Sequence, residues 1–287
     1  MTARRPLVRV SGRTRQLPAG DTLPGVREQL TAARTYYVRT DGSDSNTGLA
    51  NSAGSAFLTI QKAVDVAAAF DNNNFDITIL VGPGTYAAGV VLREHVGGGT
   101  IHVRGLNADQ TSTIISVNNG SCFRGIETRY SKYKATYLTL QTTGTAGYPI
   151  LLEGGKNYLT IDQINYAAAG RTHMYIASGS ILNARGATYS ISGSVDAGWH
   201  VECIDQALFI GVLCSVTFTG TPAFIGGGFA KASRNSLLQF FSSSFSGTAT
   251  GQRYLADLGA GIFVNGAGAS YLPGSTAGSA TTPGWYA

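Results

Sequence analysis

The chain has 287 residues and a mass of 29.9 kDa, enough for a sizeable core in one or two domains. Hydrophobic residues make up 43%, which excludes a disordered composition, and charged residues make up only 13%, about half the usual share. No apolar run reaches the roughly 18 residues of a membrane span, so we expect no membrane-spanning helix. The 38 glycines and many short polar side chains suit flat sheets joined by tight turns.

The net charge of +5 is concentrated at the start of the chain. Residues 1–34 hold seven basic and two acidic residues, whereas residues 35–287 hold 14 of each. A nucleic-acid groove on the neutral body has no electrostatic support, because binding phosphates requires basic surface. The basic segment has no interleaved aromatic residues, so we expect it to dock on a protein partner and expect no nucleic acid as a ligand.

Residues 1–34 are predicted to form an N-terminal arm. Residues 7–10 alternate like a strand, Ser11-Gly12 is a turn, and residues 13–17 return, which predicts a hairpin. Two prolines then break regular structure, and residues 26–34 have the pattern of a short helix. A piece this small does not fold alone, so the arm is expected to order against a partner.

The body is predicted over residues 35–265 and opens on a loop, 41–48, rich in Asp, Asn and Gly. The loop is faintly similar in spacing to a calcium loop, but the glycine and the terminal glutamate of such a loop are misplaced, so no metal is expected. Apolar residues at helical spacing then predict one amphipathic helix over residues 57–69. A helix there would cover the open edge of the first coil.

A short strand motif recurs about every 20 residues along the body. It occupies residues 137–140, 158–161, 180–183 and 200–203, at steps of 21, 22 and 20 residues, with turn residues between. A fixed period in this range is typical of stacked coils, each too thin to bury its apolar side alone. The sequence therefore predicts an all-β parallel β-helix, or solenoid, with a sandwich or a β-propeller as the alternatives.

Residues 266–287 are predicted to be a Gly/Ser/Thr-rich cap or tail. Tyr271, Leu272, Trp285 and Tyr286 are its apolar anchors, so we expect it to pack on the body or on a neighbouring subunit.

The cysteines and histidines indicate neither a disulfide framework nor a zinc site. Cys122, Cys203 and Cys214 are an odd set in a chain without an evident secretory signal, and two of them lie in apolar strands, so buried thiols are expected. The four histidines are scattered and no CxxC pair occurs. No cofactor is predicted.

Three consecutive features resemble the opening of pectate-lyase-like right-handed β-helix proteins. They are the strand and Asn/Asp/Gly loop of residues 36–48, the helix of residues 59–65, and a strand ending in Gly-Pro-Gly-Thr-Tyr at residues 79–86. The resemblance implies a right-handed coil with an N-terminal capping helix. It does not imply an activity, because that fold hosts lyases, hydrolases, esterases and inert adhesins.

Residues 6–23 resemble the N-terminal segment of tailed-phage and prophage tail fibre and tail spike proteins, and residues 272–284 resemble endings seen in such proteins. The resemblance implies a homotrimer located on a virion tail, made in the host cytoplasm and held by a tail or baseplate protein through the arm. The arm side chains that it assigns to tail attachment are Leu7, Val8, Val10, Leu17, Asp21 and Leu23.

Candidate catalytic carboxylates follow from the needs of glycoside hydrolysis, which uses two acids across the scissile bond. Counting coil steps places Glu153, Tyr175 and Asp196 on one side of three successive coils, 22 and 21 residues apart. Two such steps put Glu153 and Asp196 roughly 9–10 Å apart. His200, Glu202 and Asp205 form a second group, the first two on one strand face. The alternative is that all of these side chains sit on solvated corners and outer faces.

The calcium-binding Asp cluster of uronate lyases and the paired Asp of pectin methylesterases have no counterpart that we can match, so enzymatic activity is not favoured. Glycan binding asks for less: exposed aromatic rings and a few polar groups. Tyr130, Tyr133, Tyr175 and Trp199, with Arg129 for acidic sugars, are the candidates, and the alternative is that the rings fill coil cores or trimer contacts.

The sequence thus predicts a tail fibre or tail spike subunit that binds host-surface polysaccharide. The alternatives are a depolymerase, either a glycoside hydrolase or a lyase, acting on capsule or lipopolysaccharide, and a purely structural tail component.

Overall fold

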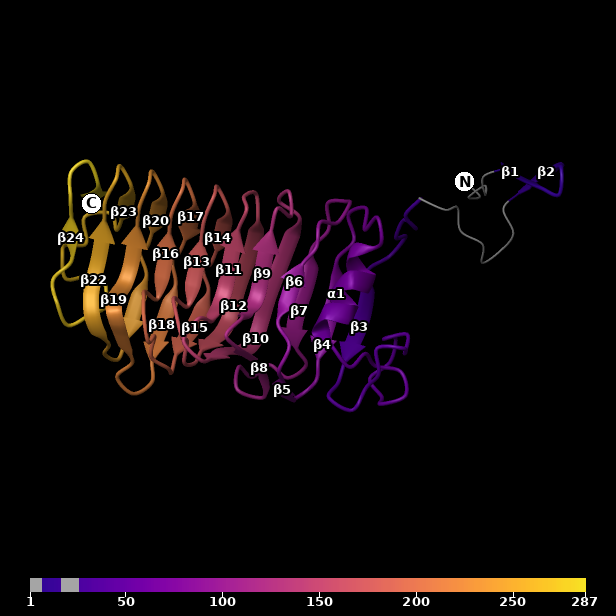
Figure 1. The fold of residues 1–287 in the computed structure, drawn as a ribbon, viewed down its shortest axis with the longest axis horizontal. Helices are drawn as coiled ribbons and strands as arrows, with labels where there is room; N and C mark the ends of the chain where they lie inside the picture. The colour runs from indigo at the N-terminus through magenta and orange to yellow at the C-terminus, as the bar shows by residue number, and fades with distance from the viewer. Residues whose placement is uncertain (1–6, 17–25) are drawn as a thin grey trace.

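The computed structural model describes residues 7–16 and 26–287. Residues 26–287 form a parallel β-solenoid of about eight turns with one short helix at its N-terminal end (Figure 1). The predicted all-β, right-handed parallel β-helix is confirmed, and the sandwich and propeller alternatives are excluded.

The predicted hairpin of the arm is confirmed. Strands β1 (Leu7–Val10) and β2 (Arg13–Gln16) pair antiparallel, and Ser11 and Gly12 between them have φ of 51° and 77°. Two left-handed residues make the tight turn whose twist matches that of paired strands. Of the residues assigned to tail attachment, Leu17, Asp21 and Leu23 lie outside the described residues.

The prediction of a helix over residues 26–34 is wrong. Gln29 forms a parallel bridge with Asp71, and the Leu30 N–H donates to the Asp71 carbonyl at 2.8 Å. The Leu30 side chain is buried in the first coil. Backbone pairing with the body and burial of one leucine therefore override a weak helical preference.

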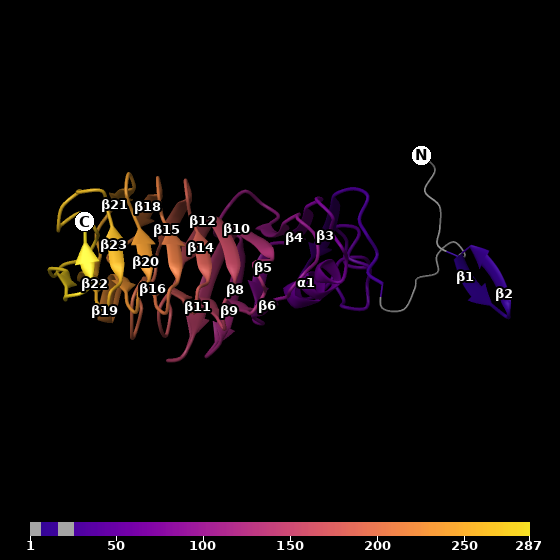
Figure 2. The ribbon, with the colours of Figure 1, turned by 90° about the horizontal axis from the view of Figure 1, so that it is seen from above.

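Each complete coil passes over three faces. Face 1 contains β3 (Arg34–Val38), β4 (Ile77–Val81), β7 (Ile101–Gly105), β14 (Ile181–Asn183), β17 (Leu208–Ile210), β20 (Leu237–Gln239), β23 (Gly261–Phe263) and β25 (Trp285–Tyr286). Face 2 contains β5 (Gly84–Tyr86), β8 (Thr113–Asn118), β15 (Thr188–Ile191), β18 (Ser215–Phe218) and β21 (Ser244–Ser246). Figure 2 shows the face 1 strands side by side along the solenoid.

Face 3 is the eight-stranded sheet. It contains β6 (Val90–Leu92), β9 (Ser121–Ile126), β11 (Tyr148–Glu153), β13 (Met174–Ile176), β16 (Val201–Cys203), β19 (Ala223–Ala232), β22 (Thr250–Ala256) and β24 (Ser279–Ala280).

Strands β10 (Lys132–Thr143) and β12 (Tyr158–Tyr166) cross from face 1 to face 2 and join both into one fifteen-stranded sheet. They bend at Tyr137 and Gln163, whose φ values are 56° and 52°. A single left-handed residue turns each strand without ending its pairing.

The coils are longer than the predicted 20 residues, and their length varies. Tyr158 pairs with Ile181, Ile181 with Leu208, and Leu208 with Leu237, which are steps of 23, 27 and 29 residues. Tyr158 also pairs with Lys132, not with the Tyr137 that begins the first copy of the motif. Residues 200–203 lie over face 3, whereas residues 158–161 lie on face 1. The apparent 20-residue repeat therefore compared similar tetrapeptides from different positions in the coil.

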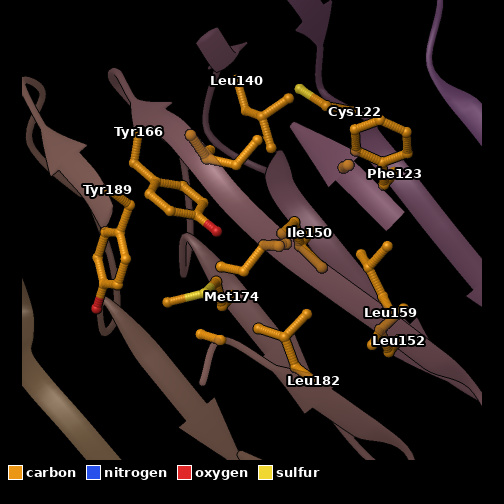
Figure 3. Close-up of a cluster of buried hydrophobic side chains, with 14 of the residues drawn as sticks. Cys122, Phe123, Leu140, Ile150, Leu152, Leu159, Tyr166, Met174, Leu182 and Tyr189 are labelled. Atoms are coloured by element: carbon orange, nitrogen blue, oxygen red, sulfur yellow. The ribbon is translucent and has the colours of Figure 1, made fainter. Parts of the chain in front are cut away.

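Inward side chains stack in columns along the solenoid. On face 1, Tyr133, Leu159, Leu182, Phe209 and Leu238 follow one another in register, and each is at most 1% exposed. Figure 3 shows how residues from successive coils, such as Ile150, Met174 and Tyr166, meet in one core. The apolar area that each coil buries against the next is the main stabilising term of such a fold.

The three cysteines are free and buried, as predicted. Burial raises the pKa of the Cys122 thiol to about 12, so it stays protonated and packs as a small apolar group.

The predicted capping helix is confirmed as α1 (Ile60–Ala68), with Thr59 as its N-cap. It lies beside β6, the edge strand of face 3. The Gln61 side-chain amide accepts from the Val91 N–H at 2.6 Å and donates to the Val91 carbonyl at 3.2 Å. One side chain thus supplies the two hydrogen bonds that a further strand would have made to this exposed edge.

The Asp/Asn/Gly loop serves the same cap. One Asp44 carboxylate oxygen accepts from the Leu58 and Thr59 N–H groups at 3.0 and 2.9 Å, and the other accepts from the Thr59 hydroxyl at 2.7 Å. The loop spacing is therefore explained by the start of the helix.

The C-terminal segment packs on the body, as predicted. Strand β24 pairs with β22 and strand β25 with β23. Leu272 is fully buried, the Tyr271 hydroxyl accepts from the Ser243 N–H at 2.8 Å, and the Tyr286 ring stacks on Tyr254 at 3.8 Å. Trp285 remains 42% exposed. Among the described residues no helix is long and apolar enough to cross a membrane.

Two histidines meet in the centre of the core. His173 Nδ1 lies 3.1 Å from His200 Nδ1, and His173 Nε2 lies 2.8 Å from the Ala167 carbonyl. The rings of Tyr166, Tyr189 and Phe229 surround His200. Burial lowers the pKa of His173 to about 4, and burial followed by repulsion from His173 lowers that of His200 well below 6.5. Both rings are therefore neutral at pH 7.

Replacing Asp44 by alanine should lower the free energy of unfolding by about 1–2 kcal/mol, because two backbone N–H groups and a hydroxyl at the helix start lose their acceptor. Asp44→Asn keeps one oxygen acceptor and is the matched control. Urea unfolding measures both variants. Equal losses for alanine and asparagine would mean that the hydrogen bonds are not what the carboxylate contributes.

Acid should weaken the solenoid. Between pH 6.5 and about 4 the unfolded chain binds a proton that the folded His173 does not, so stability falls as the pH drops. Near pH 5 this one residue costs on the order of 2 kcal/mol relative to pH 7.5. Unfolding of the wild type and of His200→Phe is followed across this range. The variant, which keeps a ring between Tyr189 and Phe229, should show a shallower pH dependence, and an unchanged slope would remove the histidine pair as its source.

Candidate functional site

The corner where face 3 passes into face 1 is built from pairs of left-handed residues. These pairs are Ser178–Gly179, Asp205–Gln206 and Arg234–Asn235, all with φ between 53° and 69°. The second residue of each pair donates its N–H to the first residue of the pair in the following coil, as in Gly179 to Asp205 at 2.9 Å and Gln206 to Arg234 at 3.0 Å. This ladder fixes the turn in every coil and directs its side chains outward.

Tyr130 begins this corner and is its most prominent side chain. Its φ is 61°, its N–H donates to the Lys156 carbonyl at 2.5 Å, and its side chain is 46% exposed. The hydroxyl donates to the Gly179 carbonyl at 3.3 Å, two coils further along. The ring therefore lies across the intervening corner, where Gly154 and Gly155 carry no side chain.

Three adjacent hollows share Tyr130, and together we call them the Tyr130 groove. One of about 630 Å³ is lined by Glu127, Arg129, Tyr130, Gly154, Gly155, Lys156 and Ser178. A second of about 620 Å³ is lined by Tyr130, Lys156, Ser178, Gly179, Asp205, Gln206, Arg234 and Asn235. A third of about 350 Å³ lies toward face 1 and is lined by Tyr130, Lys132, Tyr158 and Ile181. The groove thus offers an exposed ring with charged and amide groups on both sides.

The ion pairs along the groove are exposed and weak. Arg234 lies 3.3 Å from Asp205, and Arg129 lies 3.5 Å from Glu94. Exposed pairs of this kind contribute about 0–1 kcal/mol, so a polar ligand can replace them at little cost. Lys156 has no acidic partner within 4.0 Å among the described residues.

The outer row of face 3 borders the groove and carries Tyr175 and Glu202 in register. Lys231 Nζ lies 2.8 Å from Glu202, in the least exposed ion pair of the described chain, and Thr172 donates to the same carboxylate at 3.2 Å. Burial, followed by the nearby Glu202 charge, raises the pKa of Tyr175 to about 12. Tyr175 is therefore a neutral hydroxyl on the protein surface.

The predicted row of Glu153, Tyr175 and Asp196 does not exist. Tyr175 pairs with Leu151 on one side and Glu202 on the other, because these coils are 24 and 27 residues long and not 22 and 21. Glu153 instead pairs with Ile126 and lies 2.6 Å from Arg124. Asp196 is exposed at another corner, where its N–H donates to the Ala169 carbonyl.

The second predicted group is also separated. His200 is buried in the core, whereas Glu202 lies on the outer surface of face 3 and Asp205 at the corner. The prediction that residues 200 and 202 share a face fails because the chain bends into the core before β16 begins. Glu153, Glu202 and Asp205 each face a basic residue. Ion pairs favour the ionised carboxylate, whereas a general acid must be neutral, so the arrangement suits binding better than acid catalysis.

The aromatic candidates divide between surface and core. Tyr130 and Arg129 line the groove, and Tyr175 lies on the outer surface of face 3. Tyr133 is 1% exposed and donates its hydroxyl to the Arg93 carbonyl at 2.7 Å, and Trp199 is 7% exposed. Both are core side chains, so their prediction as glycan contacts is corrected.

Sequence reasoning missed Lys156, Gln206, Arg234 and Asn235, which the corner ladder brings to the groove. The available signal was a pair of polar or glycine residues just before each short apolar strand, which is typical of a repeated tight turn. Among the described residues no group of three or more His, Cys, Asp or Glu could hold a metal ion.

The fold and the corner define the class of this chain as a parallel β-solenoid with an open surface groove. Comparison with protein-family models, curated proteins and solved structures found no match.

Two tyrosines three residues apart should behave oppositely when truncated. Tyr133→Ala removes a buried ring and should lower the free energy of unfolding by about 3–5 kcal/mol. Tyr130→Ala removes an exposed ring and should change it by about 0.5 kcal/mol or less. Urea unfolding of both variants checks the assignment. A large loss for Tyr130→Ala would make that ring a structural element instead of a free binding surface.

Proposed function

We propose that this chain is a subunit of a phage or prophage tail fibre or tail spike and that it binds a host-surface glycan in the Tyr130 groove. The arm attaches it to a tail or baseplate protein, and the solenoid carries the receptor site. The resemblance of residues 6–23 to tail fibre N-termini supports the attachment. The exposed Tyr130 ring between two polar hollows is the observation that carries the glycan site.

The groove has the groups that sugars need. A tyrosine ring presents an apolar face to the C–H side of a pyranose, while hydroxyl groups of the sugar require donors and acceptors around it. Ser178, Gln206 and Asn235 supply neutral hydrogen-bonding groups, and Glu127 and Asp205 supply acceptors. These side chains come from several successive coils, so an extended glycan can contact more than one coil.

The groove is also rigid. Its turns are held by backbone hydrogen bonds between coils, and the Tyr130 hydroxyl is tied to the Gly179 carbonyl. A preorganised site loses little conformational entropy when the ligand binds.

We further propose that the subunit assembles as a homotrimer around an axis parallel to the solenoid. Cyclic symmetry suits a protein carried on an axial particle. Three weak grooves on one rigid assembly then bind a repeating polysaccharide with much higher avidity than one groove alone.

Tyr130→Ala should weaken binding to a recognised glycan by roughly tenfold, the loss of one stacking contact of about 1.4 kcal/mol. The measurement is binding of the full chain to an array of bacterial surface polysaccharides, followed by titration of the best ligand. Leu213→Ala is the matched control, because Leu213 is also exposed, also apolar and also left-handed, with a φ of 61°, at the other end of face 1.

Equal loss for the two variants would place the glycan elsewhere. Shortening of the bound polysaccharide during the titration would favour the depolymerase alternative over a purely binding role.

A further inference from the structure

A group of basic side chains without acidic partners lies on face 1 beside the Tyr130 groove. Arg104, Lys132 and Lys134 make no ion pair within 4.0 Å in the described chain. Elsewhere on the body, seven other basic residues are each paired with an acid, including Arg124 and Arg234 on the neighbouring surfaces. Basic charge on this solenoid is mostly neutralised locally, and this cluster is an exception.

Sheet register holds the cluster together. Lys132 and Lys134 project from the same side of β10, and Lys134 pairs with His102 on β7. Arg104 lies on β7 two residues after His102, with its guanidinium 5.1 Å from the centre of the Tyr137 ring. Neighbouring strands are about 4.8 Å apart, so the three charges share one small area of flat sheet.

The surroundings do not relieve the repulsion among these charges. His102 is half-buried and donates or accepts at the Thr136 hydroxyl, 2.8 Å away. Burial first, and then the charges of Lys134 and Arg104, lower the pKa of His102 to about 4, so it is neutral at pH 7. The nearest acids are engaged elsewhere: Asp76 accepts from the Thr100 N–H and Asp162 from the Thr188 N–H. An anion is the complementary group for this surface.

The cluster is continuous with the groove. Lys132 lines the hollow toward face 1 together with Tyr130, Tyr158 and Ile181. Lys156, also without an acidic partner among the described residues, lies on the other side of the Tyr130 ring. A sugar stacked on Tyr130 would therefore have a cationic side chain on either side.

We propose that the ligand of the Tyr130 groove is an anionic polysaccharide whose carboxylate or phosphate groups bind the cluster of Arg104, Lys132 and Lys134. This inference rests on the proposed glycan-binding function and adds the chemical class of the glycan. The guanidinium and ammonium groups supply charge-assisted hydrogen bonds to the acidic groups, and Tyr130 and Tyr158 contact the sugar rings.

The test compares binding of polygalacturonate, a polymer of glycerol phosphate, and neutral dextran to the full chain. The first two separate carboxylate from phosphate, and both should bind more tightly than dextran. A variant with Arg104→Gln, Lys132→Gln and Lys134→Gln should bind the preferred polyanion roughly tenfold to a hundredfold more weakly. Its binding should also depend less steeply on salt, because fewer ionic contacts remain.

The matched control carries Arg9→Gln, Arg13→Gln and Arg15→Gln in the hairpin, which removes the same charge from another surface. It should bind like the wild type. Equal losses for both variants would mean that the polyanion responds only to net charge and would overturn the inference. Circular dichroism and the melting temperature check that the face 1 variant is folded.

The failures of the two proposals differ. If a neutral glycan binds and Tyr130→Ala weakens it while the polyanions do not bind, the anionic class is wrong and the glycan-binding site stands. If no glycan of any class binds, the proposed function itself is wrong.

Discussion

The parallel backbone ladder between coils is the interaction on which the rest of this structure depends. Every strand pair of the described solenoid is parallel, and one column of inward side chains continues from Tyr133 to Tyr286 along face 1. A coil has no core of its own, so its apolar side chains are buried only when the next coil is in register. The two ends show the same constraint. Gln61 completes the first edge of face 3 with a side-chain amide, and two-residue strands, β24 and β25, end the sheets at the other side.

The candidate site is a direct product of that ladder. No single coil contains the Tyr130 groove: Tyr130, Lys156, Gly179, Gln206 and Asn235 come from successive corners, and the inter-coil hydrogen bonds hold them in line. The same register gathers Arg104, Lys132 and Lys134 on face 1, although the sequence separates them by up to 30 residues. Binding chemistry on such a fold is therefore additive along the axis, one row of side chains for each coil.

The fold was predictable because its signals are local. Glycine-rich turns, short β-branched and aromatic strands, and the apolar spacing of residues 57–69 each indicate an element whatever its partners. Register was not predictable, because coil length is set at the corners. Inserted corner residues such as Arg234–Asn235 do not change the strand pattern, yet they decide which residue faces which. For that reason Tyr130 and Arg129 were correctly placed on the surface, whereas the Glu153–Tyr175–Asp196 row was wrong and Tyr133 and Trp199 proved to be core residues.

Engineered disulfides test the register most directly. The native cysteines are buried, so a surface pair can be oxidised selectively. The account predicts that Leu151→Cys with Tyr175→Cys forms a bond readily, because these residues are direct neighbours on β11 and β13. Glu153→Cys with Tyr175→Cys, the pair that a simple repeat of the strand motif would align, should remain reduced, because a diagonal offset of two residues exceeds the roughly 7 Å limit between Cα atoms. Cross-linking of the second pair in preference to the first would contradict the register and, with it, the groove built on it.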